Sequence, residues 1–271
     1  MNVNQAQRDQ WNAENQARTW PRRERVTSSM TPLLLGLLSP QPGERILDIG
    51  SGGGLAGLDV ARAVGASGTV VGFDISAPLV ALATQRAAEA GIVQARFIAG
   101  DAQTDNIPHA PFDAVMSQFG VMFFANPVAA FANIRRHLRP GARLAFACWQ
   151  PASENAWFPG PVLTRYAPPP PPNTSGLPAP GPFAFGDVGY VRGILEQAGF
   201  GDIRHELIAQ EVAIPDDAIA DQETITPLRL DAERAAAAWR DLQAHADSLR
   251  GPDGLLHIRI APQIFQATNH A

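Results

Sequence analysis

Between residues 44 and 149, short apolar runs alternate with stretches whose apolar residues recur at helical spacing. The runs have the length of buried strands and cover residues 45–49, 69–73, 95–99, 112–117 and 143–149. The stretches between them predict helices at residues 56–64, 78–90 and 127–138. Repeated strand–helix units with almost wholly apolar strands are typical of a parallel sheet covered by helices on both faces.

The flanking segments have different patterns. The first 40 residues are polar and helical in pattern, with Trp11 and Trp20 as apolar anchors, and Pro21 predicts a break. A short apolar helix is expected at 33–38. The last third predicts helices and strands again, with helices at 187–198 and 231–249 and strands at 203–213 and 258–268.

Changes in composition divide the chain into four parts. Residues 1–42 predict an N-terminal helical cap, and residues 43–150 an α/β core. Residues 151–186 hold eleven prolines, five of them consecutive at 168–172, and predict an extended or irregular insertion. This insertion begins at the carboxyl end of the fifth strand, and open α/β sheets bind their ligands at the carboxyl ends of their strands. The insertion is therefore either a surface connector or a rim over a pocket. Residues 187–271 are expected to complete the sheet and add a helical segment on the pocket side.

The amino-acid composition excludes several classes of enzyme and kinds of site. All 21 basic residues are Arg, so enzymes that need a Lys amine, such as those forming Schiff bases, are excluded. A single Cys, Cys148, permits no internal disulfide or Cys-rich zinc site, and no metal site is expected. The net charge of −5 argues against nucleic acid. The polar N-terminus and the lack of a long apolar run predict a cytoplasmic protein without a membrane span.

A glycine-rich turn follows the first predicted strand, in the segment Glu44-Arg-Ile-Leu-Asp-Ile-Gly-Ser-Gly-Gly-Gly54. Such a turn lets the backbone and a helix N-terminus approach a ligand. Residues 52–57 match the G-x-G-x-x-G pattern of dinucleotide enzymes, but the match begins two residues too late relative to the end of the predicted strand. Asp48 precedes the first glycine, and a carboxylate there disfavours a pyrophosphate and suits a cationic ligand. Alternatively, Asp48 only braces the turn.

Two more acids end the next two predicted strands. Asp74 closes the second strand, 20 residues after Gly54, where a carboxylate can bind both ribose hydroxyls of either cofactor type. Asp101 closes the third strand and, with the Ala102 N–H, could meet an adenine. Because parallel strands end at one edge of a sheet, the three acids predict a common ligand.

These motifs together resemble the class I S-adenosylmethionine-dependent methyltransferases, in the branch of small-molecule and ubiquinone/menaquinone-type enzymes. The segments that carry the resemblance are ERILDIGSGGG, VVGFDIS, FIAGDAQ, FDAVMSQFGVMFFANP and HLRPGARLAFACW, within about residues 10–150. The resemblance implies a Rossmann-like α/β fold with a seven-stranded, mostly parallel sheet whose last strand is antiparallel. It implies S-adenosylmethionine as cofactor and S-adenosylhomocysteine as product. Ser51 and Ala142 depart from the usual Cys and Gly of this branch.

The resemblance also implies roles for individual residues. Asp48, Gly50 and Gly52 would line the methionine part of the cofactor, and Ser117 and Gln118 would lie near its amine and sulfonium. Asp74 would bind the ribose, Asp101 and Ala102 the adenine, and Trp20 would close over the ligand from the N-terminal segment. The full expected cofactor set is Trp20, Asp48, Gly50, Ser51, Gly52, Gly54, Asp74, Ile75, Asp101, Ala102, Ser117 and Gln118.

Methyl transfer needs mainly a well-placed acceptor and the exclusion of water, and a base only where the acceptor must lose a proton. No G-x-S-x-G, H-E-x-x-H or C-x-x-C motif occurs, and none of the six His is assigned as a base, so the catalytic residues stay unknown. An apolar acceptor pocket, or else lid and core packing, is expected from Phe119, Met122, Phe123, Trp149 and Trp157. Such a pocket favours a planar or lipophilic small molecule, such as a quinone, polyketide or aromatic metabolite.

Two alternatives remain open at this point. One is a nicotinamide-dependent oxidoreductase, and the other is a non-methylating cyclase or regulatory protein on the same scaffold. The sequence leaves a homodimer open as well. The cluster Arg18, Arg22, Arg23 and Arg25 is interpreted as a solvated helix face or hinge.

Overall fold

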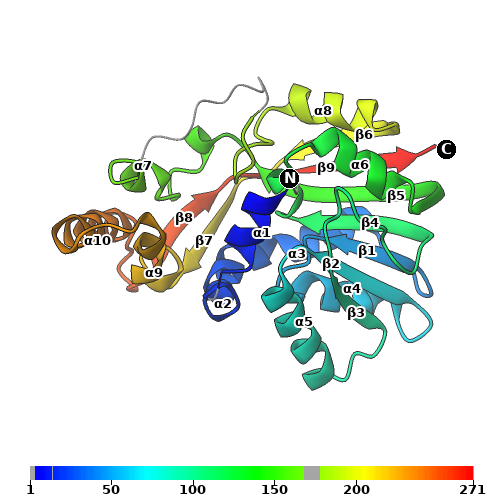
Figure 1. The fold of residues 1–271 in the computed structure, drawn as a ribbon, viewed down its shortest axis with the longest axis horizontal. Helices are drawn as coiled ribbons and strands as arrows, with labels where there is room; N and C mark the ends of the chain where they lie inside the picture. Colours follow the sequence, from blue (N-terminus) through cyan, green and yellow to red (C-terminus); the bar gives the residue numbers. More distant parts are fainter. Residues whose placement is uncertain (1–3, 14, 168–177, 271) are drawn as a thin grey trace.

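A computed structural model describes residues 4–13, 15–167 and 178–270. Its centre is a seven-stranded sheet of strand order β3-β2-β1-β4-β5-β9-β6 (Figure 1). β1 to β5 are parallel, and β9 runs antiparallel to both of its neighbours. The prediction of a mostly parallel sheet with its last strand antiparallel is therefore confirmed. The strands are β1 (Arg45–Ile49), β2 (Thr69–Asp74), β3 (Ala95–Ala99), β4 (Phe112–Gln118), β5 (Leu138–Trp149), β6 (Phe200–Leu207) and β9 (Pro262–Asn269).

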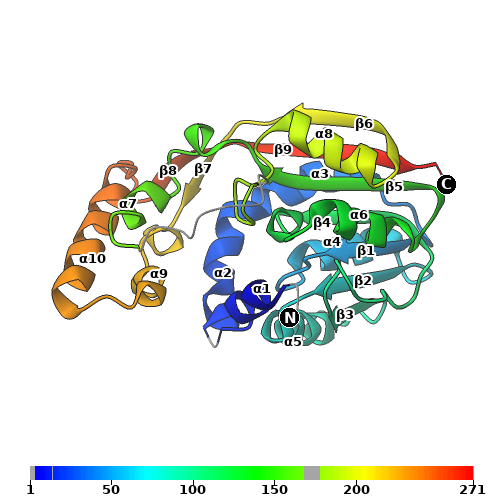
Figure 2. The same cartoon turned by 45° about the horizontal axis from the view of Figure 1, so that its top comes forward.

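Helices cover both faces of this sheet (Figure 2). α4 (Leu55–Val64) and α5 (Ala77–Glu89) connect β1 to β2 and β2 to β3, and α6 (Pro127–Arg135) connects β4 to β5 in the opposite direction along the sheet. Right-handed crossovers then place α6 on the face opposite α4 and α5. α8 (Val188–Gln197) packs beside α6, and α3 (Thr31–Leu38) packs on β4, β5 and β9.

A second, two-stranded antiparallel sheet extends from the main one (Figure 1). It pairs β7 (Gln210–Ile214) with β8 (Leu256–Ile260) and carries three helices, namely α7 (Gly160–Leu163), α9 (Gln222–Ile225) and α10 (Ala232–Asp247).

The single strands predicted at 203–213 and 258–268 are therefore wrong. Each is two strands that belong to different sheets, β6 and β7 in the first case and β8 and β9 in the second. The side chain of Gln150 donates to the carbonyls of Ile208 and Pro262 at the junction, and Pro262 has no N–H to continue the pairing.

The N-terminal segment forms α1 (Gln5–Trp11) and α2 (Gln16–Thr27), which lie between the main sheet and the small one (Figure 1). The predicted break at Pro21 is wrong, because Pro21 lies inside α2. Proline costs that helix one backbone hydrogen bond. Contacts on either side of it hold the helix together, among them the Trp20 indole N–H bonded to Glu24 at 2.8 Å. The five consecutive prolines at 168–172 lie outside the described residues.

Candidate functional site

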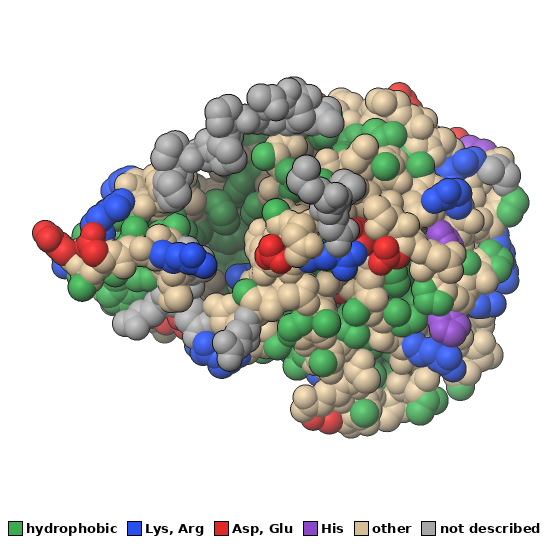
Figure 3. Space-filling view, in the orientation of Figure 1, with side chains coloured by type: hydrophobic (Ala, Val, Ile, Leu, Met, Phe, Trp, Pro, Cys, Tyr) green, Lys and Arg blue, Asp and Glu red, His purple; other side chains and the backbone are tan. Residues whose placement is uncertain are grey.

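A cavity of about 700 Å³ lies at the carboxyl ends of the main-sheet strands, enclosed by α1, α2 and the segment after β7. Figure 3 shows it as a hollow lined by hydrophobic side chains, between the small sheet and the body of the molecule. Its volume falls within the range of small-molecule and cofactor sites, about 300–1,000 Å³.

The glycine turn supplies one wall. Gly50, Gly52 and Gly54 have φ values of 65°, 54° and 82°, which side-chain-bearing residues rarely adopt. A Cβ on Gly50 would stand 2.7 Å from the Cα of Gly120, so the two backbones approach as only glycines allow. A Cβ on Gly52 would meet the Trp20 ring at 2.3 Å, whereas Gly54 packs against Ala83. Of these three glycines, only Gly50 borders the cavity.

Asp74 lies at the cavity wall and is almost fully buried. Its Oδ2 accepts the Gly52 N–H at 2.7 Å and its Oδ1 accepts the Ser76 N–H at 2.8 Å. Burial raises the pKa of Asp74, while the two N–H groups lower it. Asp74 thus holds the glycine turn against the end of β2 and still faces the ligand space.

Asp48 occupies a separate place beneath the turn. It lines a small pocket with Thr27, Ser28, Gly50 and Ser51 and does not border the large cavity. Its Oδ2 has no hydrogen-bond partner among the described residues. Burial raises the pKa of Asp48 well above its usual range, and the charge of Asp74 raises it further.

Asp101 is the third acid, and it contacts the N-terminal helix. It accepts the Asn4 side-chain N–H at 2.6 Å and the Gln103 N–H at 2.9 Å, and Arg8 lies 3.6 Å away. Asp101, Ala102 and Ile75 all line the cavity. The N-terminal helix therefore covers the part of the site predicted for the adenine.

Ser117 and Gln118 diverge at the end of β4. Ser117 is buried away from the cavity, and its Oγ accepts the Gly120 N–H at 3.3 Å. Gln118 borders both pockets, accepts from the Thr31 hydroxyl at 3.0 Å and donates to the Thr27 carbonyl at 3.1 Å. A ligand in the cavity could therefore contact Gln118, whereas Ser117 does not border the cavity.

All five residues predicted for an acceptor pocket line the cavity, namely Phe119, Met122, Phe123, Trp149 and Trp157. Phe119 stacks on Trp149 with ring centroids 4.2 Å apart, and Trp149 meets Trp157 at 5.3 Å. Trp11 packs edge-on against Phe123 at 5.0 Å. These rings form an apolar wall opposite the acids, suited to a planar ligand.

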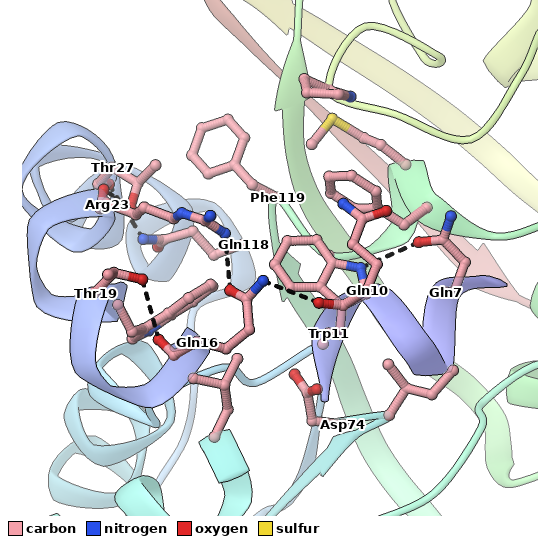
Figure 4. A pocket seen from close by; sticks show the side chains of 18 of the residues that line it. Gln7, Gln10, Trp11, Gln16, Thr19, Arg23, Thr27, Asp74, Gln118 and Phe119 are labelled. Carbon is pink, nitrogen blue, oxygen red and sulfur yellow. Dashed lines mark hydrogen bonds between the residues drawn. The ribbon is translucent and has the colours of Figure 1, made fainter. Parts of the chain in front are cut away.

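Sequence reasoning missed the polar side chains that α1 and α2 contribute (Figure 4). The cavity is lined by five residues of α2, namely Gln16, Thr19, Trp20, Arg23 and Thr27. The last four follow Gln16 by three, four, seven and eleven residues. That spacing puts them on one helix face, so the position of Trp20 could have identified the others. The missed residues of α1 and α2 include Gln7, Gln10, Gln16, Thr19, Arg22, Arg23 and Thr27, and those of the segment after β7 include Asp217, Ile219, Asp221 and Thr224.

The described wall of the cavity offers carboxylates as possible bases, but no imidazole, thiol or phenol. No His, Cys or Tyr is among its lining residues. Cys148 is buried on β5, and burial raises the pKa of its thiol. The described residues also contain no group of three acids, His or Cys able to hold a metal ion. Nor does any described helix combine the length and hydropathy needed to cross a membrane.

The donor set fits S-adenosylmethionine better than a phosphate-bearing cofactor. Asp48 and Asp74 are close enough for the charge of one to raise the pKa of the other, so a positive charge beside them is favoured and an anion is not. Arg86, the cation nearest the turn, is already bound to Glu24 and to the Gly53 carbonyl.

Comparison with known proteins agrees with a site for S-adenosylmethionine. Residues 46–141 match a methyltransferase domain family. The chain is 33% identical over 231 residues to nocamycin O-methyltransferase of Saccharothrix syringae, covering 79% of this chain and 82% of that one. It is 36% identical over 113 residues to aklanonic acid methyltransferase DauC of Streptomyces sp. (strain C5), covering 42% of this chain and 51% of that relative, about half its length. A putative methyltransferase of Bacillus halodurans superimposes with a TM-score of 0.59 at 17% identity, over 90% of this chain and all of the other, which shows a shared fold.

The chain belongs to the S-adenosylmethionine-dependent methyltransferase family, and S-adenosylmethionine is its cofactor. This membership decides against the nicotinamide alternative left open by the glycine turn. Both named relatives are methyltransferases, so the non-methylating alternative gains no support from them. The enzyme is a methyltransferase, and small-molecule acceptors fit its relatives.

Proposed function

We propose that the acid-lined half of the cavity binds S-adenosylmethionine and that its aromatic half binds a small, planar or lipophilic methyl acceptor. The observation that carries this proposal is that Asp74 and Asp101, at the ends of neighbouring strands, line the same cavity as the stacked rings of Phe119 and Trp149. Ile75, Ala102, Gly50 and Gln118 complete the cofactor half. The names of the relatives, an O-methyltransferase and a methyltransferase for aklanonic acid, favour an oxygen-bearing acceptor here too.

The bound cofactor supplies a methyl carbon activated by a positively charged sulfur. The chain's own task is then to place the acceptor within about 3 Å of that carbon and to keep water out. We assign the second task to α1 and α2, which would form a cap. Trp20 lies on the glycine turn and Asn4 bonds to Asp101, so these helices close the cofactor half from above.

Calorimetry with S-adenosylhomocysteine tests the cofactor half. Asp74→Ala should weaken its binding by at least about tenfold, because a charged hydrogen-bond acceptor is lost from the site. Asp74→Asn keeps one acceptor oxygen and should lose less. Asp59→Ala, which removes an exposed carboxylate of α4, should bind like the wild type. If NADH bound and S-adenosylhomocysteine did not, the proposal would be wrong.

We also propose that the protein works in the cytoplasm and does not bind nucleic acid. The net charge of −5 and the single, buried Cys148 support this. A homodimer remains a prediction, which sedimentation equilibrium would test.

A further inference from the structure

Arg23 differs from its neighbours on α2. Arg25 pairs with Asp217 at 2.6 Å, and Arg22 pairs with Asp217 and Asp221, so both tie α2 to the segment after β7. Arg23 pairs with no carboxylate that the structure describes. Its guanidinium donates to the Gln16 side-chain oxygen at 3.1 Å and lies 5.7 Å from the centre of the Trp11 ring. The expectation of a solvated Arg face holds for Arg23, whose side chain is exposed, but Arg23 lacks the carboxylate partners of its neighbours.

The Arg23 side chain extends into the cavity beneath the ring of Phe119 (Figure 4). Its charged end is exposed and also borders the cavity, so a ligand in the cavity can reach it. Partial burial beside the cavity wall lowers the pKa of its guanidinium. A guanidinium that borders a cavity and pairs with no described carboxylate is available for charge-assisted hydrogen bonds to an anionic ligand.

The wall of the cavity gives a second, independent reason to expect an anion. Four carboxylates line it, and each is engaged: Asp217 and Asp221 pair with Arg22 and Arg25, while Asp74 and Asp101 accept hydrogen bonds from N–H groups of the chain. The described wall offers no His, Tyr or Cys to remove a proton. An acceptor that is already ionised needs no such base. Methyl transfer to an oxyanion forms one C–O bond, breaks one C–S bond with its electron pair going to sulfur, and moves no proton.

Building on the proposed function, we propose that Arg23 is the anion-binding residue of the acceptor site and that the acceptor is an oxygen acid, ionised when it binds. A carboxylate, an acidic enol or an acidic phenol on a planar ring system meets this description. The guanidinium binds such an oxygen pair in a forked geometry, while Phe119, Trp149 and Trp157 hold the ring.

The cofactor also carries a carboxylate, so Arg23 could bind either the cofactor or the acceptor. The expected position of the cofactor carboxylate distinguishes these two possibilities. The methionine part is expected at the small pocket beside Gly50 and Ser51, which Thr27 and Ser28 also line. Arg23 lines the large cavity and is not part of that small pocket. The structure therefore favours the acceptor as the partner of Arg23.

Binding of two matched probes tests this proposal. The probes are 9,10-anthraquinone-2-carboxylate and its neutral analogue 9,10-anthraquinone-2-carboxamide, titrated into enzyme saturated with S-adenosylhomocysteine. The wild type should bind the carboxylate about tenfold or more tightly than the amide. Arg23→Gln should abolish this preference, and Arg23→Lys should keep part of it. Arg25→Gln removes the same charge from the same helix outside the cavity lining and should keep the full preference. Equal affinity for the two probes, or no binding of the carboxylate, overturns the proposal.

Cofactor binding separates this failure from a failure of the proposed function. The two compounds compared are S-adenosylhomocysteine and 5′-methylthioadenosine, which lacks the amino-acid part. For each compound, Arg23→Gln should have the same affinity as the wild type. If Arg23→Gln weakens only S-adenosylhomocysteine, Arg23 holds the cofactor carboxylate and the inference is wrong. If the wild type binds neither compound, the proposed function fails, and the probe preference without cofactor still decides whether Arg23 binds anions.

Discussion

Asp48 is the penultimate residue of β1 and lies beneath the glycine turn with only 1% of its surface exposed. Its Oδ2 has no partner among the described residues. Burial, followed by the charge of Asp74, raises its pKa well above the usual range. A carboxyl whose pKa is higher in the folded than in the unfolded chain favours folding most when it is protonated. Its contribution is complete below the unfolded pKa of about 4 and is lost as the pH rises through the folded value.

Asp48→Asn removes this titration. Relative to the wild type, the free energy of unfolding of the variant should increase as the pH rises from about 4 to 8. The change should reach at least about 1 kcal/mol, the usual cost of a buried group without a partner. Urea unfolding at several pH values measures it, with Asp59→Asn as the control for losing one negative charge. A difference between variant and wild type that stays constant over this range would contradict the argument.

At the residue scale, the sequence reveals a site residue when its position in the chain already fixes its place in the fold. Asp74 and Asp101 each follow an apolar strand, so their location at the sheet edge could be predicted. Arg23 lies among four Arg in ten residues, and nothing local tells it from Arg22 or Arg25. What distinguishes it is the pairing of the other two with Asp217 and Asp221, almost 200 residues away.

α2 is held to the core by one partly buried ion pair. Arg86 of α5 donates to both oxygens of Glu24 at 2.7 and 2.9 Å, and also to the Gly53 carbonyl at 2.8 Å. Glu24 in turn accepts from Trp20, whose ring covers Gly52. A forked, charged pair of this kind contributes more than an exposed one, because little of it is screened by water.

Arg86→Gln should therefore loosen α2 while leaving the sheet intact. We expect a loss of about 1–2 kcal/mol in stability and a roughly tenfold faster hydrogen exchange of the α2 amides. Amides of β1 and β4 should exchange as before. Arg62→Gln, which breaks an exposed pair with Asp59, should change stability by less than about 0.5 kcal/mol. Equal effects of the two substitutions would show that the Glu24 pair does not hold the helix.

At the element scale, prediction succeeded where one local pattern determines the element. The core strands are apolar runs, and the predicted bounds of the first four differ from the structure by at most one residue. The fifth strand begins at Leu138, five residues before the predicted start, because its pairing with β4 continues through Pro140 and Gly141. Prediction failed at Pro21, since the cost of proline within a helix is outweighed by contacts with the distant Arg86 and the glycine turn. It failed again at 203–213 and 258–268, because apolar alternation continues across the point where each strand changes sheets.

At the scale of the whole molecule, the small sheet is a continuation of the large one through a single antiparallel ribbon (Figure 1). Asn155, 1% exposed, lies where the ribbon leaves the main sheet. Its Oδ1 accepts the Ala261 N–H at 2.9 Å and the Trp157 indole N–H at 3.2 Å, and its Nδ2 donates to the Gln150 carbonyl at 3.2 Å. No sequence pattern indicated this junction, because the segments that Asn155 joins are about a hundred residues apart.

Asn155 thus positions Trp157 in the cavity wall and fixes the ribbon that carries the segment after β7. Asn155→Ala leaves the Ala261 N–H buried without a partner, so we expect it to cost about 2–3 kcal/mol in urea unfolding. Faster hydrogen exchange should appear in β7 and β8 and not in β1 to β4, since only the small sheet depends on this junction. Asn106→Ala, at an exposed position, should stay within about 0.5 kcal/mol of the wild type. If both sheets loosen equally, the molecule is one cooperative unit, and the junction at Asn155 does not stabilise the small sheet separately.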